Sequence, residues 1–451
     1  MKPAHALAIG VLVRMGLIPF VAHPIDIYFW YEVINGILAR GPSIVTFFPP
    51  MLFYTFIPLA YLFQFASYFF GMGTTPMQSL PIALDMSKSV YAVPLVPGLL
   101  FNVISKSPFL VGDVLIGLTL YCFAGKIGSP KIAARALTIW MLNPYVIWIS
   151  SGWGNFDVLP ALFSILSVGL LINKRLKTSA LTLAIATAFK LYPALFLFSS
   201  SVFIIKRCQR SKKALLNYLS TYLFSLLLLM LPSISLGAHS LQLLLSRLTG
   251  LEPLGFGLTY WSVALLIPIS PTMASIVSNG LLVLLLALSF WKTWQFDFEH
   301  PLLDLAKSQL SCILAIYLTQ VIIPEQFYVW SLPYAVILSV AAHLKERIYW
   351  IGSAIALLYA LSNVIPPFYL LPLAAVSAPI ANSLASIATL LSRYRIRAGE
   401  SPGAAYTPKI TYGTVYLATL GAVFSLLMVF LEMDILVGRD FTFKAKRLLH
   451  L

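Results

Sequence analysis

Acidic side chains are scarce in this sequence. Asp and Glu together number 15 among 451 residues, and only 10% of all residues carry a charge of either sign. Soluble globular domains usually carry about 25% charged residues, whereas 59% of the residues here are hydrophobic. This scarcity of charge excludes a soluble protein as the class of the whole chain and indicates an integral membrane protein.

Cysteine is also rare. Cys122, Cys208 and Cys312 each stand alone in or beside an apolar run, a spacing that gives neither a disulfide framework nor a metal-binding cluster. We interpret all three as packing residues. Walker loops, metalloprotease helices, nucleophile elbows and dinucleotide-binding fingerprints are absent in any convincing context, which removes those enzyme classes.

Long apolar runs, by contrast, recur from end to end. A run of about 20 residues can cross a hydrocarbon core about 30 Å thick as a helix that satisfies its own backbone hydrogen bonds. We therefore predict an all-α, polytopic transmembrane helical bundle with roughly 12 to 15 membrane segments. The continuous hydropathy predicts a single integral membrane domain over residues 1–451, and no internal repeat is evident.

Basic residues outnumber acidic ones by 30 to 15. They cluster in short loops, which the positive-inside rule assigns to the cytoplasm, at residues 173–177, 206–213, 343–347 and 393–397. The net charge of +15 therefore reflects the orientation of the chain in the membrane, and no nucleic-acid partner is expected. The first apolar run, about Leu7 to Phe20, lacks a convincing cleavage site and predicts an uncleaved anchor with a cytoplasmic N-terminus.

Placing each acidic residue on a membrane face narrows the set that can carry chemistry. Counting spans from a cytoplasmic N-terminus puts residues 23–48, 152–157 and 324–330 outside. Asp113 is expected to cap a helix start in a hairpin formed by the runs Val90–Ile104 and Phe109–Ala124. The other acids lie beside cytoplasmic loops, pair with a neighbouring base or give no distinct signal: Asp297, Glu299, Asp304, Glu346, Glu400, Glu252 (with Arg247), Asp85, Glu432, Asp434 and Asp440. Four acids remain on the outer side near aromatic residues: Asp26, Glu32, Asp157 and Glu325.

Two of these acids lie directly beside apolar runs. A carboxylate at the water–membrane boundary can take the proton from an attacking hydroxyl, which is the functional interpretation of Asp26. Each acid also has a structural alternative. Asp26 follows His23 and Pro24 and can cap an interfacial helix, and Asp157 can cap the span that it precedes.

Lys190 interrupts an apolar stretch of about 28 residues between two basic loops. A single tilted span would place one of these loops outside. We prefer two short half-helices, because both loops then stay in the cytoplasm and Lys190 lies at a turn within the bilayer depth. An ionised amine at that depth usually has an anionic partner or ligand, for which a phosphate is a natural candidate. Discontinuous helices often mark binding sites in membrane proteins.

The order of several short motifs resembles a known family. The motifs are Leu-Asn-Pro-Tyr at 142–145, Ser-Ser-Gly-Trp-Gly-Asn-Phe-Asp at 150–157, Lys-Leu-Tyr-Pro at 190–193, and Gln-Phe-Tyr-Val-Trp at 326–330 with Pro333. In this order they resemble the first mannosyltransferase of glycosylphosphatidylinositol synthesis and its prokaryotic relatives, polytopic glycosyltransferases of the GT-C superfamily. The motif-bearing part is residues 1–333, and residues 334–451 add further C-terminal membrane helices.

The resemblance implies a GT-C-like fold and transfer of a hexose, typically mannose, with inversion at the anomeric carbon. The donor would be a polyprenyl-phosphate sugar, the acceptor a hydroxyl on a lipid-linked or surface glycan, and membrane lipids the surroundings. Members often carry two acids separated by one residue in the first external loop, whereas this chain has Pro24 and Asp26 there. A monophosphate donor requires no cofactor, and a divalent metal stays an open alternative. Residues 47–50, Phe-Phe-Pro-Pro, resemble the aromatic–Pro segment that follows this loop.

These observations assign hypothetical roles on the non-cytoplasmic face. Asp26, with Asp157, is catalytic, and Asp26 acts as base toward the acceptor hydroxyl. Lys190, assisted by Tyr192, stabilises the leaving phosphate. The remaining residues bind substrate: Asn155 and Asp157 orient the sugar or acceptor, and Glu325, Gln326, Tyr328 and Trp330 line the acceptor side.

Two alternatives to an enzyme stay open. The elements at 142–145 and 191–193 also resemble those of a polytopic subunit of the transamidase that attaches these anchors, so a non-catalytic lipid-binding subunit is one. A transporter of lipid-linked sugars is the other, because broken helices and buried ions are also transporter features. Clustering of Asp26, Asp157 and Lys190 around one outward-facing cavity would favour the enzyme. Inverted repeats would favour the transporter, and dispersal of the three charges would favour the lipid-binding subunit.

Overall fold

A computed structural model describes most of the chain. The described residues are 1–41, 50–70, 77–79, 95–235, 256–265, 270–341, 344–363, 369–374, 379–380, 383, 386 and 412–436. Several predictions fall outside them, namely those for residues 47–49, Asp85, the Arg247–Glu252 pair, the basic loop at 393–397, Glu400 and Asp440.

The described structure is built almost entirely of helices, which confirms the all-α class. The first half contains α1 (Pro3–Leu17), α2 (Pro24–Arg40), α3 (Pro50–Phe69), α4 (Leu99–Ile127), α5 (Pro130–Met141), α6 (Pro144–Ile147), the π-helix η2 (Trp148–Trp153), α7 (Val158–Ile172), α8 (Leu176–Phe189), the 3-10 helix η3 (Tyr192–Leu195), α9 (Phe196–Arg207) and α10 (Ser211–Ser235). The second half contains the 3-10 helix η4 (Tyr260–Leu265), α12 (Pro271–Gln295), α13 (Pro301–Tyr317), the 3-10 helix η5 (Glu325–Trp330), α14 (Leu332–Val340), α15 (Glu346–Asn363), α16 (Leu371–Ala374) and α18 (Tyr412–Leu436).

Proline marks many of the helix starts. It occupies the first turn of α1, α2, α5, α6, α12 and α13, where its missing N–H costs no intrahelical hydrogen bond and its fixed φ suits the helix. Strands are few and short in the described part. β1 (Met77–Ser79) pairs antiparallel with β2 (Leu95–Pro97), and β3 (Phe256–Gly257) pairs parallel with β4 (Ile322–Ile323).

Several helices are long and apolar enough to cross a membrane, and the chain is an integral, multi-pass membrane protein. Within the described residues there are five of them, in α3, α4, α10, α12 and α18. The pair Pro130–Met141 and Pro144–Trp153, bent by 50°, makes a sixth if counted as one span. Two apolar runs counted as full spans in the sequence form α1 and α7, helices of only 15 residues, shorter than the roughly 20 residues of a full crossing. α8, with 14 residues, has the length of the short half-helix predicted before Lys190.

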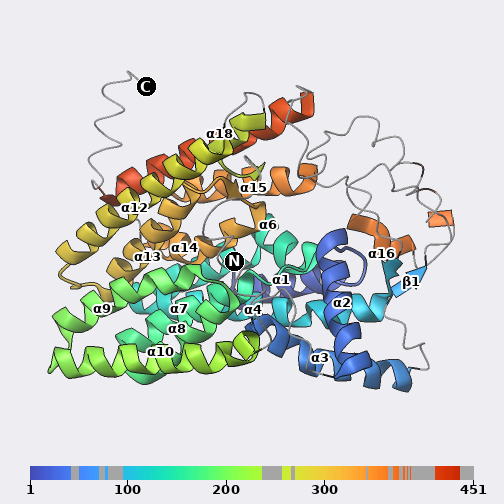
Figure 1. The fold of residues 1–451 in the computed structure, drawn as a ribbon, viewed down its shortest axis with the longest axis horizontal. Helices are drawn as coiled ribbons and strands as arrows, with labels where there is room; N and C mark the ends of the chain where they lie inside the picture. The colour runs from blue at the N-terminus through green and yellow to red at the C-terminus, as the bar shows by residue number, and fades with distance from the viewer. Residues whose placement is uncertain are drawn as a thin grey trace.

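The helices form an elongated bundle with a buried centre. Figure 1 shows α10 along one edge and α12 with α18 along the opposite edge, while α7, α8, α13 and α14 lie between them. α7 packs against α8 and α4, and α8 packs against α10. The outer helices expose large apolar side chains such as Leu227, Val283 and Leu284, as expected where lipid replaces water.

One expected hairpin is wrong. The runs Val90–Ile104 and Phe109–Ala124 do not form two helices, because α4 continues from Leu99 to Ile127 through Pro108. Asp113 therefore lies inside a long helix and is fully buried rather than capping a helix start. The carboxylate of Asp113 forms hydrogen bonds with side chains of other helices. In this case an acidic residue within an apolar run indicated a contact between helices and not a turn.

A buried polar network surrounds Asp113. The Arg14 guanidinium of α1 donates to Asp113 Oδ2 at 2.6 Å and to the Met141 carbonyl at 2.7 Å. Trp140 Nε1 donates to Asp113 Oδ1 at 2.7 Å, and Ser150 Oγ donates to Asp113 Oδ2 at 2.5 Å. This network joins α1, α4, α5 and η2, and η2 leads directly to residues 154–157.

The predicted break at Lys190 is present, but its packing differs from the expected hairpin. α8 ends at Phe189 and η3 leads into α9. α8 packs chiefly against α7 and α10, whereas α9 packs against α10, α12 and α13. The two helices are therefore not adjacent antiparallel half-helices, because each finds a larger apolar surface on other helices.

Candidate functional site

Asp26 lies in the first turn of α2, just after the end of α1. His23 precedes the helix, and its Nδ1 accepts a hydrogen bond from the Asp26 backbone N–H at 3.3 Å. The His23 ring stacks on Trp153 with centroids 4.1 Å apart. Burial lowers the pKa of His23 to about 3, so the imidazole is neutral and forms no ion pair with Asp26 despite an approach of 3.8 Å. The helix cap is thus His23, and the carboxylate of Asp26 is left for other contacts.

Two donors hold the Asp26 carboxylate. Trp153 Nε1 donates to Oδ2 at 2.6 Å and Asn155 Nδ2 donates to the same oxygen at 2.9 Å. The side chain keeps 20% of its surface exposed. α2 is not among the membrane-spanning helices, and burial raises the pKa of Asp26 there, against the opposing effect of the two donors and of Lys190.

Asn155 connects Asp26 to the second acid. Its Oδ1 accepts a hydrogen bond from the Asp157 backbone N–H at 2.8 Å. The chain reaches Asn155 through Gly154, whose φ of +79° is a left-handed conformation that favours glycine. The Gly154 carbonyl accepts from Trp30 Nε1 of α2 at 3.0 Å. The π-helix, Gly154 and α2 together therefore fix the amide of Asn155 between the two acids.

Asp157 is fully buried between Lys190 and Trp330. Its Oδ1 accepts from Lys190 Nζ at 2.6 Å and from Trp330 Nε1 at 2.7 Å. Its Oδ2 is buried and has no hydrogen-bond partner among the described residues. The capping alternative for Asp157 is wrong, because its side chain makes no cap hydrogen bond to α7. Burial raises the pKa of Asp157, against the opposing effect of Lys190.

Aromatic rings surround the Lys190 ammonium. Nζ lies 3.8 Å from the ring centroid of Phe327 and 4.7 Å from that of Trp330. Tyr192 stacks on Trp330 with centroids 4.2 Å apart and is itself buried. Cation–π contacts such as those of Lys190 with Phe327 and Trp330 stabilise a cation by about 0.5–2 kcal/mol each, the larger values applying when the cation is desolvated. Lys190 thus has both the anionic partner and the protein-lined setting that its position in an apolar run predicted.

The residues of η5 divide between two surroundings. Trp330 joins the Asp157–Lys190 pair, as described above. Tyr328 is directed elsewhere: its ring lies 5.5 Å from that of Tyr145 and 5.1 Å from that of Phe424. Glu325 is buried at the start of η5, and its backbone carbonyl accepts from Tyr145 Oη at 2.6 Å.

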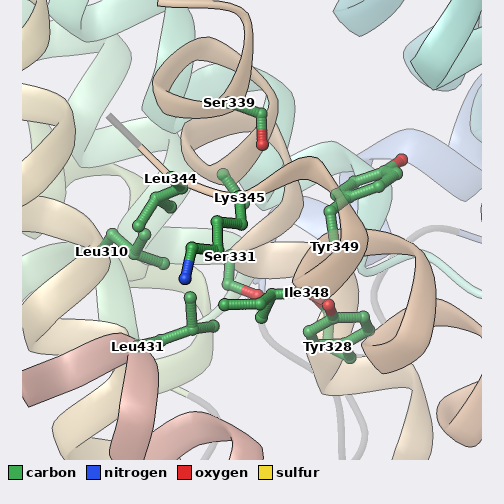
Figure 2. A pocket seen from close by; sticks show the side chains of 10 residues that line it. Leu310, Tyr328, Ser331, Ser339, Leu344, Lys345, Ile348, Tyr349 and Leu431 are labelled. Atoms are coloured by element: carbon green, nitrogen blue, oxygen red, sulfur yellow. The ribbon is translucent and has the colours of Figure 1, made fainter. Parts of the chain in front are cut away.

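Tyr328 lines a small cavity on its side of η5. Figure 2 shows the Lys345 side chain pointing into this cavity between Leu310 and Leu431. The cavity holds about 10 Å³, which is room for roughly one water molecule. Tyr328 is therefore not part of the Asp26–Asp157–Lys190 group.

The proximity of Lys345 and Tyr328 also bears on topology. The sequence assigns the loop at 343–347 to the inside and residues 324–330 to the outside. Only α14, with nine residues, separates them, and nine helical residues rise about 14 Å, less than half of the hydrocarbon core. Tyr328 and Lys345 also line the same cavity, so the prediction that their two segments lie on opposite faces of the membrane is wrong.

The structure joins most of the candidate residues and adds others. The connected group contains Asp26, Asn155, Asp157, Lys190 and Trp330, with Tyr192 stacked behind. Gln326 has a buried Oε1 without a described partner, and Glu32 is exposed on α2. Among the described residues no group of three or more His, Cys, Asp or Glu is placed to hold a metal ion.

Sequence reasoning missed three residues that organise this group: His23, Trp153 and Lys106. Trp153 belongs to the motif at residues 150–157, but no role was assigned to it from the sequence. Lys106 is a charge within an apolar run, the same signal that drew attention to Lys190. If every charged residue within an apolar run had been treated as a candidate, the sequence would have identified Lys106 and also Arg14.

Comparison with known proteins gives few matches. No protein-family model and no curated protein matches the sequence. Among solved structures, the oligosaccharyltransferase of Archaeoglobus fulgidus in the apo form is similar with a TM-score of 0.39 and 13% identity, over 87% of this chain and 56% of that one. The same enzyme tethered to an acceptor peptide gives a TM-score of 0.37 and 13% identity, over 87% and 55%. This chain spans about half the length of the solved structures that it matches.

Proposed function

We propose that this chain is a membrane glycosyltransferase of the GT-C type. It transfers a hexose, mannose in the first instance, from a polyprenyl-phosphate carrier to a hydroxyl of a lipid-linked or surface acceptor. The observation that carries the proposal is the connection of Asp26, Asp157 and Lys190. These three charged residues are far apart in the sequence, yet Asn155 bridges the acids and Lys190 pairs with the second acid.

Asp26 is the base of the proposed reaction. Its Oδ2 is occupied by Trp153 and Asn155, which orients Oδ1 toward the acceptor. The acceptor oxygen attacks the anomeric carbon from the face opposite the phosphate, its proton passes to Asp26, and the bond between the anomeric carbon and the phosphate oxygen breaks. The polyprenyl phosphate leaves with the bonding electrons, and the configuration inverts. A positioned base of this kind typically contributes 10²–10⁴-fold.

Lys190 meets the negative charge that develops on the leaving phosphate. Its ammonium group donates to Asp157 Oδ1, which Trp330 Nε1 also binds, and the aromatic rings of Phe327 and Trp330 lie against it. A preorganised cation in a water-poor site stabilises developing charge more than the same cation does in water. In this proposal no step requires a metal ion.

The clustering also weighs against the two alternatives. A lipid-binding subunit needs no base, and its charged residues would be expected to lie apart. Repeat symmetry would favour a transporter, and no internal repeat is evident in the sequence. Neither alternative explains why the Asn155 amide donates to the Asp26 carboxylate and also accepts from the backbone N–H of Asp157, whose own carboxylate pairs with Lys190.

The deciding experiment is an assay of purified protein with labelled polyprenyl-phosphate-mannose and a crude lipid acceptor pool. Asp26→Asn should lower transfer by about 100-fold or more, because the base is lost. Glu32→Gln is the matched control, since Glu32 is an exposed acid on the same helix, and it should leave transfer unchanged. Full transfer by well-folded Asp26→Asn would refute the assignment. Saturable lipid binding without transfer from any polyprenyl-phosphate sugar would favour the lipid-binding subunit.

A further inference from the structure

Lys106 is the most unusual charged residue of the described chain outside the proposed catalytic group. Its side chain is fully buried inside α4. No carboxylate lies within ion-pair distance of Nζ among the described residues, whereas Arg14 and Lys190 each have one. A buried ammonium is costly unless hydrogen bonds compensate for lost hydration. The hydrogen-bond partners of Lys106 therefore indicate which structural role the buried ammonium has.

All partners of Lys106 are backbone carbonyls, and they come from two segments. At the end of α1, Nζ donates to Ile18 at 3.2 Å and to Val21. In the π-helix η2, it approaches the carbonyls of Ser151 at 3.1 Å and Gly152 at 3.4 Å. The first segment leads within a few residues to Asp26, and the second leads to Trp153 and Asn155. Lys106 thus bridges the two segments whose side chains meet at the Asp26 carboxylate.

The surroundings make this bridge specific. The hydrogen of Gly154 faces the aliphatic chain of Lys106, and a Cβ at Gly154 would overlap the lysine side chain. Asn102, one turn earlier on α4, donates to the carbonyls of Ile18 and Val21 at 2.8 and 3.2 Å. Asn102 therefore holds the first segment alone, whereas Lys106 reaches both. The two segments also meet directly, because the His23 backbone N–H donates to the Trp153 carbonyl at 3.1 Å.

We propose that Lys106 is a positioning residue, whose buried ammonium sets the distance between the Asp26 carboxylate and its donors Trp153 and Asn155. The catalytic consequence rests on the proposed function, because it takes Asp26 as the base. The geometric part does not, because the hydrogen bonds to Asp26 exist whatever reaction the site performs. Without the ammonium, the carbonyls of Val21 and Ser151 lose a shared partner. The contact between His23 and Trp153 then joins the two segments without this support, and the position of Asp26 relative to its donors shifts.

The direct test reads the carboxyl group of Asp26 itself. Infrared spectra of protein labelled with ¹³C-aspartate, minus those of Asp26→Asn, isolate the Asp26 band and its titration with pH. In Lys106→Met the titration midpoint should move to higher pH, because the carboxylate loses the Trp153 and Asn155 donors that favour its ionised form. Lys126→Met is the matched control, since Lys126 is exposed in the last turn of the same helix, and it should leave the midpoint unchanged.

Two further variants keep the test decisive if Lys106→Met does not fold. Gly154→Ala forces the same contact from the other side, because the new methyl group meets Lys106, and it should move the midpoint in the same direction. Lys106→Gln keeps two N–H donors without the charge and should give an intermediate shift. An unchanged Asp26 band in the folded variants would overturn the proposal.

Activity separates this proposal from the proposed function. If Asp26 is the base, Lys106→Met should lower kcat by about 100-fold with little change in the donor KM, as expected for a reacting group misplaced by about 1 Å. A shifted Asp26 band in a protein that transfers no sugar would support the positioning role and refute the transferase. A transferase that depends on Asp26 but shows the same band and kcat in Lys106→Met would refute the positioning role.

Discussion

At the scale of single residues, the Asp26 carboxylate combines two properties that a base needs. Burial raises its pKa, while Trp153 and Asn155 donate to one oxygen and keep the ionised form accessible. A carboxylate with no donors would be protonated too readily, and one in open water would be too weak a base. The balance depends on hydrogen bonds from residues far along the chain.

This balance predicts a pH dependence. Transfer requires ionised Asp26, so kcat/KM should fall as pH drops through its pKa, at a higher pH than for an ordinary aspartate, because burial raises that pKa. Asn155→Ala removes one donor to the carboxylate, so the acidic limb should move to still higher pH. Asn217→Ala, at an exposed position on α10, is the control. An acidic limb at the same pH in Asn155→Ala and wild type would show that Asp26 does not govern it.

The Asp157–Lys190 pair predicts coupled effects. Lys190→Met should weaken use of the polyprenyl-phosphate donor. The donor KM should rise because the cation facing the bound phosphate is lost, and kcat should fall because the charge that develops on the leaving phosphate is less stabilised. Asp157→Asn should weaken donor use as well, since Asp157 holds the ammonium. Because the two residues act through one contact, the double variant should be little worse than either single variant. Additive losses, or a donor KM unchanged by Lys190→Met, would contradict the phosphate role.

At the scale of elements, irregular helices build the site. η2 is a π-helix, η3 and η5 are 3-10 helices, and each carries or adjoins a residue of the group. π-helices often occur at functional sites, because the wider turn redirects side chains. Helix breaks at Lys190 and near Asp157 follow from the sequence, since Pro193 follows the first, and Gly154 and Pro160 flank the second. The identity of each helix's neighbours does not, as the packing of α8 and α9 demonstrates.

The buried Arg14–Asp113 pair predicts a stability effect at this scale. Asp113→Leu leaves the Arg14 guanidinium buried without its carboxylate, which should destabilise the protein by about 3–5 kcal/mol. The double variant Arg14→Met, Asp113→Leu should recover much of the loss, because no uncompensated charge remains. Thermal unfolding in detergent measures both.

The Arg135–Glu346 pair provides the control for this comparison. Arg135 is largely exposed, with 59% of its side-chain surface accessible, and exposed pairs contribute about 0–1 kcal/mol. Glu346→Gln should therefore leave the unfolding temperature nearly unchanged. A loss in Asp113→Leu no larger than that in Glu346→Gln would mean that the buried network does not hold α1, α4, α5 and η2 together.

At the scale of the whole molecule, the Arg135–Glu346 contact joins two loops that the basic residues assign to the same face. Arg135 follows the turn at residues 126–131, and Glu346 belongs to the loop at 343–347. A contact between these loops requires that they lie on one side of the membrane. The positive-inside rule gives the same result from the basic residues of the two segments alone.

This agreement predicts the outcome of a labelling experiment. In a variant without Cys122, Cys208 and Cys312, single cysteines at Lys131 and Lys345 should react with a membrane-impermeant thiol reagent from the same face. A cysteine replacing the exposed Glu32 should react only from the opposite face if Asp26 faces outward. Labelling of the two lysine positions from opposite faces would contradict the structure.

The amino-acid sequence by itself determined the class of the protein and the small set of charges worth following. A lipid solvent requires apolar helices and makes each retained charge costly, so composition and position identify an all-α membrane protein and leave Lys190 and four outer acids as candidates. The resemblance in motif order then singles out Asp26 and Asp157 among the acids. These inferences need no knowledge of contacts, because the solvent acts on every residue in the same way.

Only the tertiary structure decided which charges meet. Asp113 turned from an expected cap into the partner of Arg14, Tyr328 lies apart from the group, and Lys106 joins the two segments beneath Asp26. In a bundle whose surfaces are uniformly apolar, hydropathy does not specify which helices are neighbours. Close packing and the hydrogen bonds of a few buried polar groups choose them instead, and these depend on residues far apart in the chain.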